Sequence, residues 1–260
     1  MKRLIVCIAS IGIFATAVAE KGFHVHEYPG YAGLDPIGKT GFTVHQPDRP
    51  QPPRVVPADC NASMGALPPS DAIVLFDGTS LDQFQENEWE IIDDYVRATH
   101  KGLVTKGKFG DFQMHVEWRA PNPPSGTPNN MGNSGLYIMG RYELQVFDSY
   151  SCKIYADGSA GAMYGQTPPA VNACRKPGEW QSFDIVFIAP RFKGEKLVSP
   201  AYITVFHNGI LIHNKTELLG PTGHKTANPY TAHAARLPIN FQAHNSPVEY
   251  RNIWIRDLED

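Results

Sequence analysis

Two stretches of the chain carry residue types that could move protons. The first runs from Arg141 to Val146, where polar and apolar residues alternate. Side chains on a β-strand point to opposite faces in turn, so Arg141, Glu143 and Gln145 would share one face. A carboxylate can take up a proton, and an arginine can hold an anion or sugar hydroxyls. We interpret this face as the floor of a binding cleft.

The second stretch is L-P-I-N-F-Q-A-H-N (237–245), in which Asn240, Gln242 and His244 would share a strand face. An imidazole is available as acid or base near neutral pH. Glu143 is therefore our first candidate for a catalytic base, and His244 is the second, as base or proton donor. The alternatives are an ion pair between Glu143 and Arg141 and a structural role for His244.

Further polar and aromatic residues could bind a substrate. The run 112–119 has an apolar face and a polar face that holds Glu117 and Arg119, either at the rim of a site or as a structural ion pair. The long segment after Asp148 contains Tyr155 and Tyr164, which could grip a sugar, and Trp180 is either a stacking platform or core. The predicted substrate-binding residues are Asn133, Tyr137, Gln145, Tyr164, Gln166, Asn172, Trp180, Gln242, Glu117 and Arg119.

Many short strands must position these residues. Helical periodicity is nearly absent, whereas short apolar or alternating runs recur between Gly, Asp and Asn turn signals. Asn208-Gly209 is a strong hairpin signal within the run 201–214. This pattern predicts an antiparallel all-β sandwich.

The N-terminal part of the chain differs from the rest. Lys2 and Arg3, an apolar run and Ala17-Val18-Ala19 predict a signal peptide over 1–19. The apolar run is short for a membrane-spanning helix, so we expect export to the periplasm or outside the cell, with no stable membrane insertion after cleavage. Residues 20–70 are rich in Pro and Gly and predict an arm along the domain or a leader from the membrane, and 71–260 would form the sandwich.

Charge and cysteine content bear on the class of partner and on disulfide pairing. The net charge is −3 and no basic run is present, which argues against nucleic acid as a partner. Cleavage would leave Cys60, Cys152 and Cys174. We expect Cys152 and Cys174 to pair in an oxidising compartment, with three free thiols as the alternative.

Several motifs, in order, resemble the 3-keto-disaccharide hydrolase domain family over roughly residues 72 to 258. They are L-F-D-G-T-S-L (75–81), F-G-D-F-Q-M-H-V-E-W-R (109–119), G-N-S-G-L-Y-I-M-G-R-Y-E-L-Q-V-F-D-S-Y (132–150), Y-G-Q-T-P-P-A-V-N-A (164–173), G-E-W-Q-S-F-D-I-V-F (178–187) and V-E-Y-R-N-I-W-I-R (248–256). The resemblance implies a concanavalin A-like jelly-roll sandwich of two antiparallel sheets. It also implies cleavage of 3-keto-glycosides, either 3-keto-glucosides or 3-keto-disaccharides.

The implied reaction needs a base rather than two paired carboxylates. A ketone at carbon 3 acidifies the hydrogen on carbon 2, whose removal allows the group on carbon 1 to leave, and hydration then completes a net hydrolysis. Arg141 could stabilise the enolate. The chain departs from the family at Ala243-His244-Asn245, where Asp-His-Gly is frequent, and at Cys152 and Cys174, whose joint presence supports the pairing.

No cofactor is certain from the sequence. A divalent metal ion could polarise the keto oxygen, and Glu143 and His244 are acceptable ligands. No short-spacing metal motif such as H-E-x-x-H is present.

Two other functions stay open at this point. One is a β-glucanase, since Glu143, Gln145 and Asp148 have the spacing of an E-x-D-x-x-E pattern with the central carboxylate replaced by an amide. The other is a non-catalytic carbohydrate-binding module, because a fold alone does not fix a function. The expected partner in the main interpretation is an oxidised (3-keto) glycoside or oligosaccharide.

Overall fold

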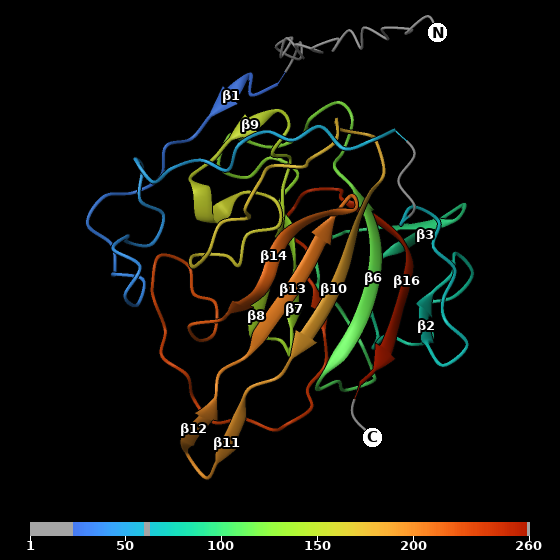
Figure 1. Ribbon diagram of the computed structural model, residues 1–260. Helices are drawn as coiled ribbons and strands as arrows, with labels where there is room; N and C mark the ends of the chain where they lie inside the picture. Colours follow the sequence, from blue (N-terminus) through green and yellow to red (C-terminus); the bar gives the residue numbers. More distant parts are fainter. Residues whose placement is uncertain (1–22, 60–62, 259–260) are drawn as a thin grey trace, which may run out of the picture.

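Two antiparallel β-sheets pack face to face in the computed structural model, which describes residues 23–59 and 63–258 (Figure 1). Within these residues the one helical element is the short 3-10 helix η1, Ala156–Gly158. The predicted all-β sandwich is therefore confirmed. The signal peptide predicted for 1–19 and Cys60 lie outside the described residues.

The larger sheet has eight strands in the order β14-β13-β10-β6-β16-β4-β3, with β2 added against β16. All its pairings are antiparallel. Its strands are β2 (Ile73–Phe76), β3 (Glu90–Ile92), β4 (Tyr95–Arg97), β6 (Phe112–Arg119), β10 (Gln181–Ile188), β13 (Tyr202–His207), β14 (Ile210–Glu217) and β16 (Glu249–Asp257).

The smaller sheet has four strands in the order β5-β15-β7-β8. Two pairs of short strands lie outside both sheets: β1 pairs with β9 in parallel, and β11 pairs with β12. The bounds are β5 (Leu103–Val104), β7 (Ser134–Ile138), β8 (Tyr142–Val146), β15 (Asn240–Phe241), β1 (His26–Glu27), β9 (Cys152–Lys153), β11 (Arg191–Lys193) and β12 (Lys196–Ser199).

The core lies between the two sheets and follows from strand alternation. On β6, Met114, Val116 and Trp118 point inward and are at most 1% exposed. On β8, Tyr142, Leu144 and Val146 belong to the same buried cluster. The polar residues of each strand therefore occupy its other face, so the two polar faces lie on opposite sides of the sandwich.

The predicted hairpin forms as expected. Strands β13 and β14 pair antiparallel and are joined by Asn208-Gly209. Both residues have positive φ, 53° and 78°, which suits the two-residue turn that matches strand twist.

The N-terminal arm lies along the domain (Figure 1). It contributes β1, which pairs with β9, and Arg54 forms a parallel bridge with Asn172. Arg49 is 7% exposed and donates a hydrogen bond to the carbonyl of Gln166. The arm is thus joined to the domain at several separate points.

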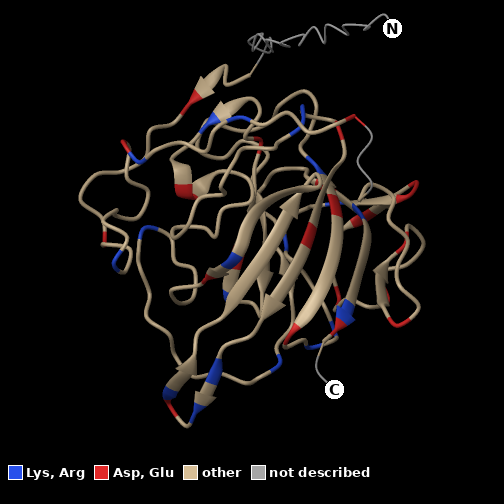
Figure 2. Ribbon diagram, viewed as in Figure 1, with Lys and Arg blue, Asp and Glu red and all other residues tan. Residues whose placement is uncertain are grey.

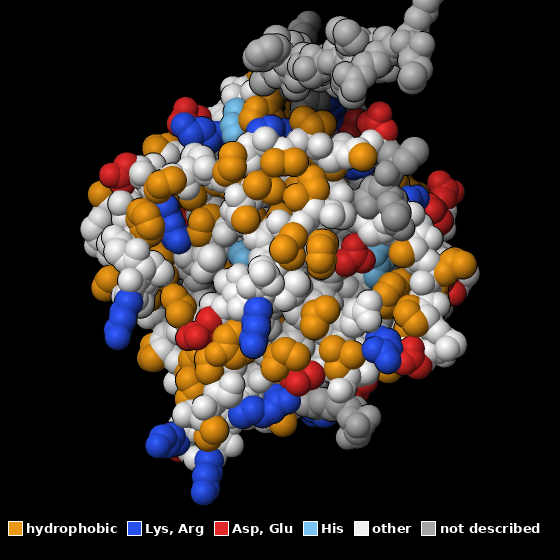
Figure 3. All heavy atoms as spheres, in the orientation of Figure 1, with side chains coloured by type: hydrophobic (Ala, Val, Ile, Leu, Met, Phe, Trp, Pro, Cys, Tyr) orange, Lys and Arg blue, Asp and Glu red, His pale blue; other side chains and the backbone are white. Residues whose placement is uncertain are grey.

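The surface carries both signs of charge without an extended basic face in the view shown (Figure 2). Hydrophobic side chains are scattered over the same side (Figure 3), and the partly exposed ones include Val186, Phe206 and Leu211 of the larger sheet. Over the described ranges, the chain forms no helix of the length and apolarity needed to span a bilayer.

The expected disulfide between Cys152 and Cys174 is wrong. Both thiols are free and buried. The Cys152 sulfur lies 3.0 Å from the carbonyl oxygen of Pro128, and the Cys174 sulfur lies 3.8 Å from that of Phe147. Each thiol faces a different backbone carbonyl, and burial raises the pKa of both to about 12.

Candidate functional site

The outer face of the smaller sheet gathers polar side chains from three strands. Tyr137 of β7 pairs directly with Glu143 of β8 and with Asn240 of β15. Gly135 pairs with Gln145, and its carbonyl accepts the backbone N–H of Gln242. Directly opposed residues share a face, so this register places Glu143, Gln145, Asn240 and Gln242 together, as predicted.

Glu143 is the buried carboxyl group of this face. It is 3% exposed, and burial raises its pKa to about 8, offset in part by a hydrogen bond from Tyr137. Gly135 allows this position, because a Cβ there would lie 2.4 Å from the Glu143 Oε1 atom. A carboxyl group with this pKa can exchange a proton near neutral pH.

Two loops cover the edge of β8 beside Glu143. The Glu143 N–H donates to Thr222 Oγ1, and the Glu143 carbonyl accepts the N–H of Tyr164. The Tyr164 hydroxyl lies 2.9 Å from the Tyr155 hydroxyl and 3.1 Å from His224 Nδ1. Burial raises the pKa of Tyr164 above its ordinary value, with the Glu143 charge acting in the same direction. Tyr164 therefore stays protonated next to Glu143.

A polar hollow of about 260 Å³ opens beside these residues. Its lining includes Asn133, Gln145, Tyr164 and His244 from the predicted set. The side-chain oxygens of Asn133 and Gln145 are buried and accept no hydrogen bond from the protein. Both residues line the hollow and each has an acceptor that the protein leaves unpaired; we call these two oxygens the oxygen pair.

His244 reaches the hollow from a loop rather than from a strand. Strand β15 ends at Phe241, and the exposed His244 follows in irregular chain. The expectation that His244 shares a regular strand face with Asn240 and Gln242 is wrong, although its place in the lining agrees with a site role.

Arg141 does not join Glu143. It lies in the turn before β8, after Met139 and Gly140, which both have positive φ. Its guanidinium donates to Thr231 Oγ1 at 3.3 Å. The cause is the turn, which directs Arg141 away from the alternation that Glu143 and Gln145 follow.

The side-chain amides of Gln166 and Asn172 form hydrogen bonds with backbone groups of neighbouring loops. The Gln166 amide donates to the Gly220 carbonyl and accepts the Leu219 N–H, both at 2.8 Å. The Asn172 amide donates to the Ser149 carbonyl and accepts the Cys174 N–H. Both side-chain amides therefore anchor loops, and their contact with a substrate stays a prediction.

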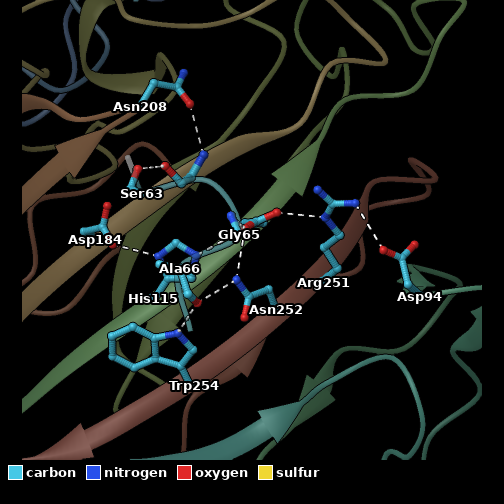
Figure 4. Close-up of polar contacts among 12 residues, drawn as sticks. Ser63, Gly65, Ala66, Asp94, His115, Asp184, Asn208, Arg251, Asn252 and Trp254 are labelled. Atoms are coloured by element: carbon cyan, nitrogen blue, oxygen red, sulfur yellow. Dashed lines mark hydrogen bonds and ion pairs between the residues drawn. The ribbon is translucent and has the colours of Figure 1, made fainter. Parts of the chain in front are cut away.

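Glu117 belongs to β6 of the larger sheet, and its partners Gly65, Arg251 and Asn252 are labelled in Figure 4. It accepts hydrogen bonds from Arg251, Asn252 and the Gly65 N–H. Burial would raise its pKa, but hydrogen bonds from His115 and these groups lower it to about 2. Glu117 is therefore a carboxylate locked in an ion-pair network, not part of the polar hollow.

Arg119 and Trp180 lie on the same side as Glu117. The Arg119 guanidinium forms an ion pair with Glu249 and lies 4.5 Å from the centre of the Trp180 ring. The Arg251 guanidinium lies 4.2 Å from the same ring centre. Trp180 is half-buried against two cations, so it is neither hydrocarbon core nor a platform of the polar hollow.

Seven lining residues were not among the predicted site residues, and three of these carry a ring with a polar group. The three are Tyr31 from the arm, Tyr155 and His224. The Lys225 ammonium lies 3.8 Å from the centre of the Tyr31 ring. Tyr155 lies in the loop whose tyrosines suggested sugar binding. No local pattern links Tyr31 or His224 to β8, because Tyr31 precedes this strand by more than a hundred residues and His224 follows it by about eighty.

Among the described residues, no aspartate or glutamate lines the hollow itself. Within the described ranges no group of three His, Cys, Asp or Glu side chains is arranged to hold a metal ion. Asp148, the last residue of the glucanase-like spacing, is 1% exposed and accepts the N–H groups of Tyr150 and Ser151. Asp148 therefore holds a turn.

Comparison with known proteins agrees with this geometry. The family model described as 3-keto-alpha-glucoside-1,2-lyase-like domain matches residues 71–256. A crystal structure of a candidate glycosyl hydrolase from Parabacteroides distasonis is 37% identical, with a TM-score of 0.70, over 86% of this chain and 100% of that chain. A second such structure from the same organism is 17% identical over 73% of this chain and 94% of that chain, with a TM-score of 0.52, and shows the shared fold alone.

A search of curated protein sequences found no match. The family model nevertheless covers more than half of the chain. The chain belongs to the 3-keto-alpha-glucoside-1,2-lyase-like family of carbohydrate-active β-sandwich proteins.

Proposed function

We propose that this protein cleaves 3-keto-glycosides by elimination followed by hydration. The observation that carries the proposal is Glu143, a buried carboxyl group whose pKa is raised to about 8. Glu143 does not itself line the polar hollow, but its neighbours Gln145 and Tyr164 do. Catalytic bases work best when their pKa lies near the operating pH. The family match and the 37%-identical glycosyl hydrolase candidate support a sugar as substrate.

In the proposed reaction Glu143 removes the proton on carbon 2. The C2–H electron pair forms the enolate with the keto oxygen at carbon 3, and Tyr164 donates a hydrogen bond to that oxygen. The enolate then collapses, the ketone re-forms, a double bond forms between carbons 1 and 2, and the C1–O bond breaks. His244 gives a proton to the departing oxygen, and water adds across the double bond to complete a net hydrolysis.

The oxygen pair of Asn133 and Gln145 would orient the sugar by accepting its hydroxyl protons. Tyr137 would hold the Glu143 carboxyl group through its hydrogen bond. Arg141 has no part in this proposal, because its guanidinium binds Thr231.

The direct test offers the protein 3-keto-trehalose and 3-keto-glucosides together with their unoxidised counterparts, with and without a chelator. We expect turnover of the keto compounds only, and products made in heavy water should carry deuterium on carbon 2. Glu143→Gln should abolish both turnover and deuterium uptake. Turnover of unoxidised glycosides without deuterium on carbon 2 would contradict the proposal.

The β-glucanase alternative needs two carboxyl groups on either side of the glycosidic bond. Asp148, the second carboxyl group of that spacing, is 1% exposed and accepts the N–H groups of Tyr150 and Ser151, so it holds a turn and is not available as the partner of Glu143. The binding-module alternative predicts sugar binding without turnover, so the same assay separates it from an enzyme.

We also propose export of the mature protein, on the signal-peptide pattern of residues 1–19. N-terminal sequencing of protein recovered from outside the cytoplasm should begin at Glu20. An intact Met1 on the recovered protein would contradict export by cleavage.

A further inference from the structure

His45 of the N-terminal arm lies behind three rings that line the polar hollow. These rings, which we call the ring wall, belong to Tyr155, Tyr164 and His224. The centre of the His45 ring lies 4.0 Å from that of Tyr155, 4.9 Å from that of Tyr164 and 5.9 Å from that of His224. His45 is itself fully buried and is not among the residues that line the hollow. It therefore packs on the ring wall from the protein side.

The polar ends of the ring wall are joined to one another. The Tyr155 hydroxyl lies 2.9 Å from the Tyr164 hydroxyl, which lies 3.1 Å from His224 Nδ1. The Tyr164 hydroxyl is also the group that donates to the keto oxygen in the proposed reaction. Because a phenol oxygen lies in the plane of its ring, a shift of the Tyr164 ring would move this donor by a similar amount.

Asp157 of η1 fixes His45 and the loop of Tyr164 relative to each other. Its carboxylate accepts the His45 backbone N–H at 2.9 Å and lies 3.3 Å from His45 Nδ1. Its backbone carbonyl accepts the N–H of Gly165, the residue after Tyr164, at 3.0 Å. Asp157 and His45 are both fully buried. One buried residue thus bonds the arm on one side and the tyrosine loop on the other.

The arm backbone holds the His45 ring in place from its own side. His45 has a φ of 54°, in the left-handed region that side chains other than glycine adopt infrequently. Its carbonyl accepts the Tyr31 N–H at 2.9 Å, and a Cβ at Gly30 would lie 2.3 Å from that carbonyl oxygen. Neither ring nitrogen of His45 has a hydrogen-bond partner among the described residues. The ring therefore acts on the ring wall through packing.

We propose that His45 is a positioning residue for the Tyr164 hydroxyl, so that the arm contributes to catalysis without touching the substrate. The inference rests on the proposed function and adds a residue to the same site. A donor stabilises an oxyanion only when it is held where the charge develops in the transition state. A misplacement of about 1 Å can cost about 10²-fold in rate. Since the enolate gains more from this donor than the ketone does, loss of His45 should lower kcat more than it changes KM.

The test is a double-mutant cycle on the kcat for one 3-keto-glucoside. Tyr164→Phe removes the hydroxyl but keeps the ring, and should lower kcat about 10²-fold. His45→Leu keeps apolar volume but removes the flat ring. It should lower kcat about tenfold in the otherwise unmodified protein and less than about twofold in the Tyr164→Phe protein, because residues that act through one group are not additive. Equal losses in both backgrounds, or no loss in either, would overturn the assignment.

Three further variants complete the cycle. His45→Phe restores a flat ring and should keep kcat within about threefold of the unmodified protein; a loss as large as that of His45→Leu would overturn the packing role. His45→Asn also removes the ring but suits left-handed backbone, so it repeats the cycle if the leucine variant does not fold. His207→Leu is the matched control at a buried histidine of the larger sheet, whose ring centre lies 4.7 Å from that of Phe183. It should leave kcat per folded molecule within about twofold.

The same measurements separate this inference from the proposed function. If the unmodified protein turns over no 3-keto-glucoside, the proposed function fails and the role of His45 fails with it. If the protein turns over the substrate and Tyr164→Phe is slow, but His45→Leu acts equally in both backgrounds, the function stands and only the role of His45 is wrong.

Discussion

Glu143 and Glu117 are buried glutamates, each on a strand in which polar and apolar residues alternate, yet their surroundings shift their pKa values in opposite directions. Glu143 has a tyrosine neighbour and no cation among its pKa determinants, and burial raises its pKa to about 8. Burial alone would raise the pKa of Glu117, but hydrogen bonds from His115, Asn252, the Gly65 N–H and Arg251 lower it to about 2. These four partners are labelled in Figure 4. A proton can leave or join Glu143 near neutrality, whereas Glu117 stays ionised.

The comparison teaches that a strand's polar face becomes reactive or structural according to what packs on it. On the larger sheet, arm residues Gly65 and Ala66 bond the network directly: Gly65 donates to Glu117, and Ala66 accepts from Asn252 and Trp254. On the smaller sheet, no cation or second amide among the described residues bonds Glu143, whose one side-chain partner is Tyr137. The first carboxyl group is thus held ionised by the protein, whereas the second is left able to exchange a proton.

The largest expected effect is the loss of activity in Glu143→Gln. Removing the base should lower kcat/KM on 3-keto-glycosides by about 10³-fold, within the range typical of general bases. The amide has nearly the same shape, so circular dichroism and the thermal transition should show an intact fold. Activity within tenfold of wild type would remove Glu143 from the mechanism.

Glu117→Gln should instead damage stability. It leaves Arg251 and His115 without their buried carboxylate, a change that costs about 3 kcal/mol of unfolding free energy. Denaturant titration measures this loss, and activity per folded molecule should stay within twofold. Asp94→Asn is the matched control, because Asp94 meets the same arginine with 66% of its side chain exposed and should cost less than about 1 kcal/mol. Equal effects of the two changes would refute the assignment of Glu117 as the buried anchor.

Activity should depend on pH through Glu143. The base form increases as pH rises, so kcat/KM should climb about tenfold per pH unit and level off above about 8. A rate profile from pH 5.5 to 9.5 on one 3-keto-glycoside tests this. A plateau that already begins at pH 5 would assign the proton transfer to another group.

The two glutamates should also give opposite pH dependences of stability. Glu143 has a folded pKa of about 8, above its ordinary 4.5, so its contribution is full below pH 4.5 and is lost as pH rises through 8. Glu117 has a folded pKa of about 2, so its contribution is present above pH 4.5 and is lost as pH falls through 2. Glu143→Gln should therefore raise Tm relative to wild type more at pH 8.5 than at pH 4.5, and Glu117→Gln should lower it least near pH 2.

The smallest expected effect is that of Tyr137→Phe. Losing its hydrogen bond removes the influence that lowers the Glu143 pKa, so the rising limb of the rate profile should move to higher pH. Activity at pH 7 should fall by about three- to tenfold, as expected for one hydrogen bond to a charged group. An unchanged limb with reduced activity would assign Tyr137 to substrate contact alone.

Strand alternation was sufficient to predict much of the fold and the shared face of Glu143 and Gln145. The period of two is local, so the inward residues of β6 and β8, and the shared face of Glu143 and Gln145, follow from six or eight consecutive residues. The Asn208-Gly209 hairpin is equally local.

What the sequence could not settle depends on contacts between distant segments. Glu117 and Glu143 sit in similar alternating runs, and the difference arises from Arg251, which is 134 residues from Glu117 in sequence. Arg141 was misplaced because Met139 and Gly140 adopt left-handed backbone and end the alternation before β8. The cysteine pair was inferred because Cys152 and Cys174 bracket one Gly-rich loop, but each thiol packs against a different carbonyl.

The arm's attachment has a consequence for how the protein becomes competent during synthesis. His26 and Glu27 emerge from the ribosome first, but their partners Cys152 and Lys153 follow more than 120 residues later, and Ala227, which donates to Asp35 of the arm, follows later still. The arm must wait, unpaired, until most of the chain is made. A protein shortened to the residues of the family match would lack Tyr31 in the wall of the polar hollow, so fragments chosen by domain boundaries alone would misrepresent what this molecule can bind.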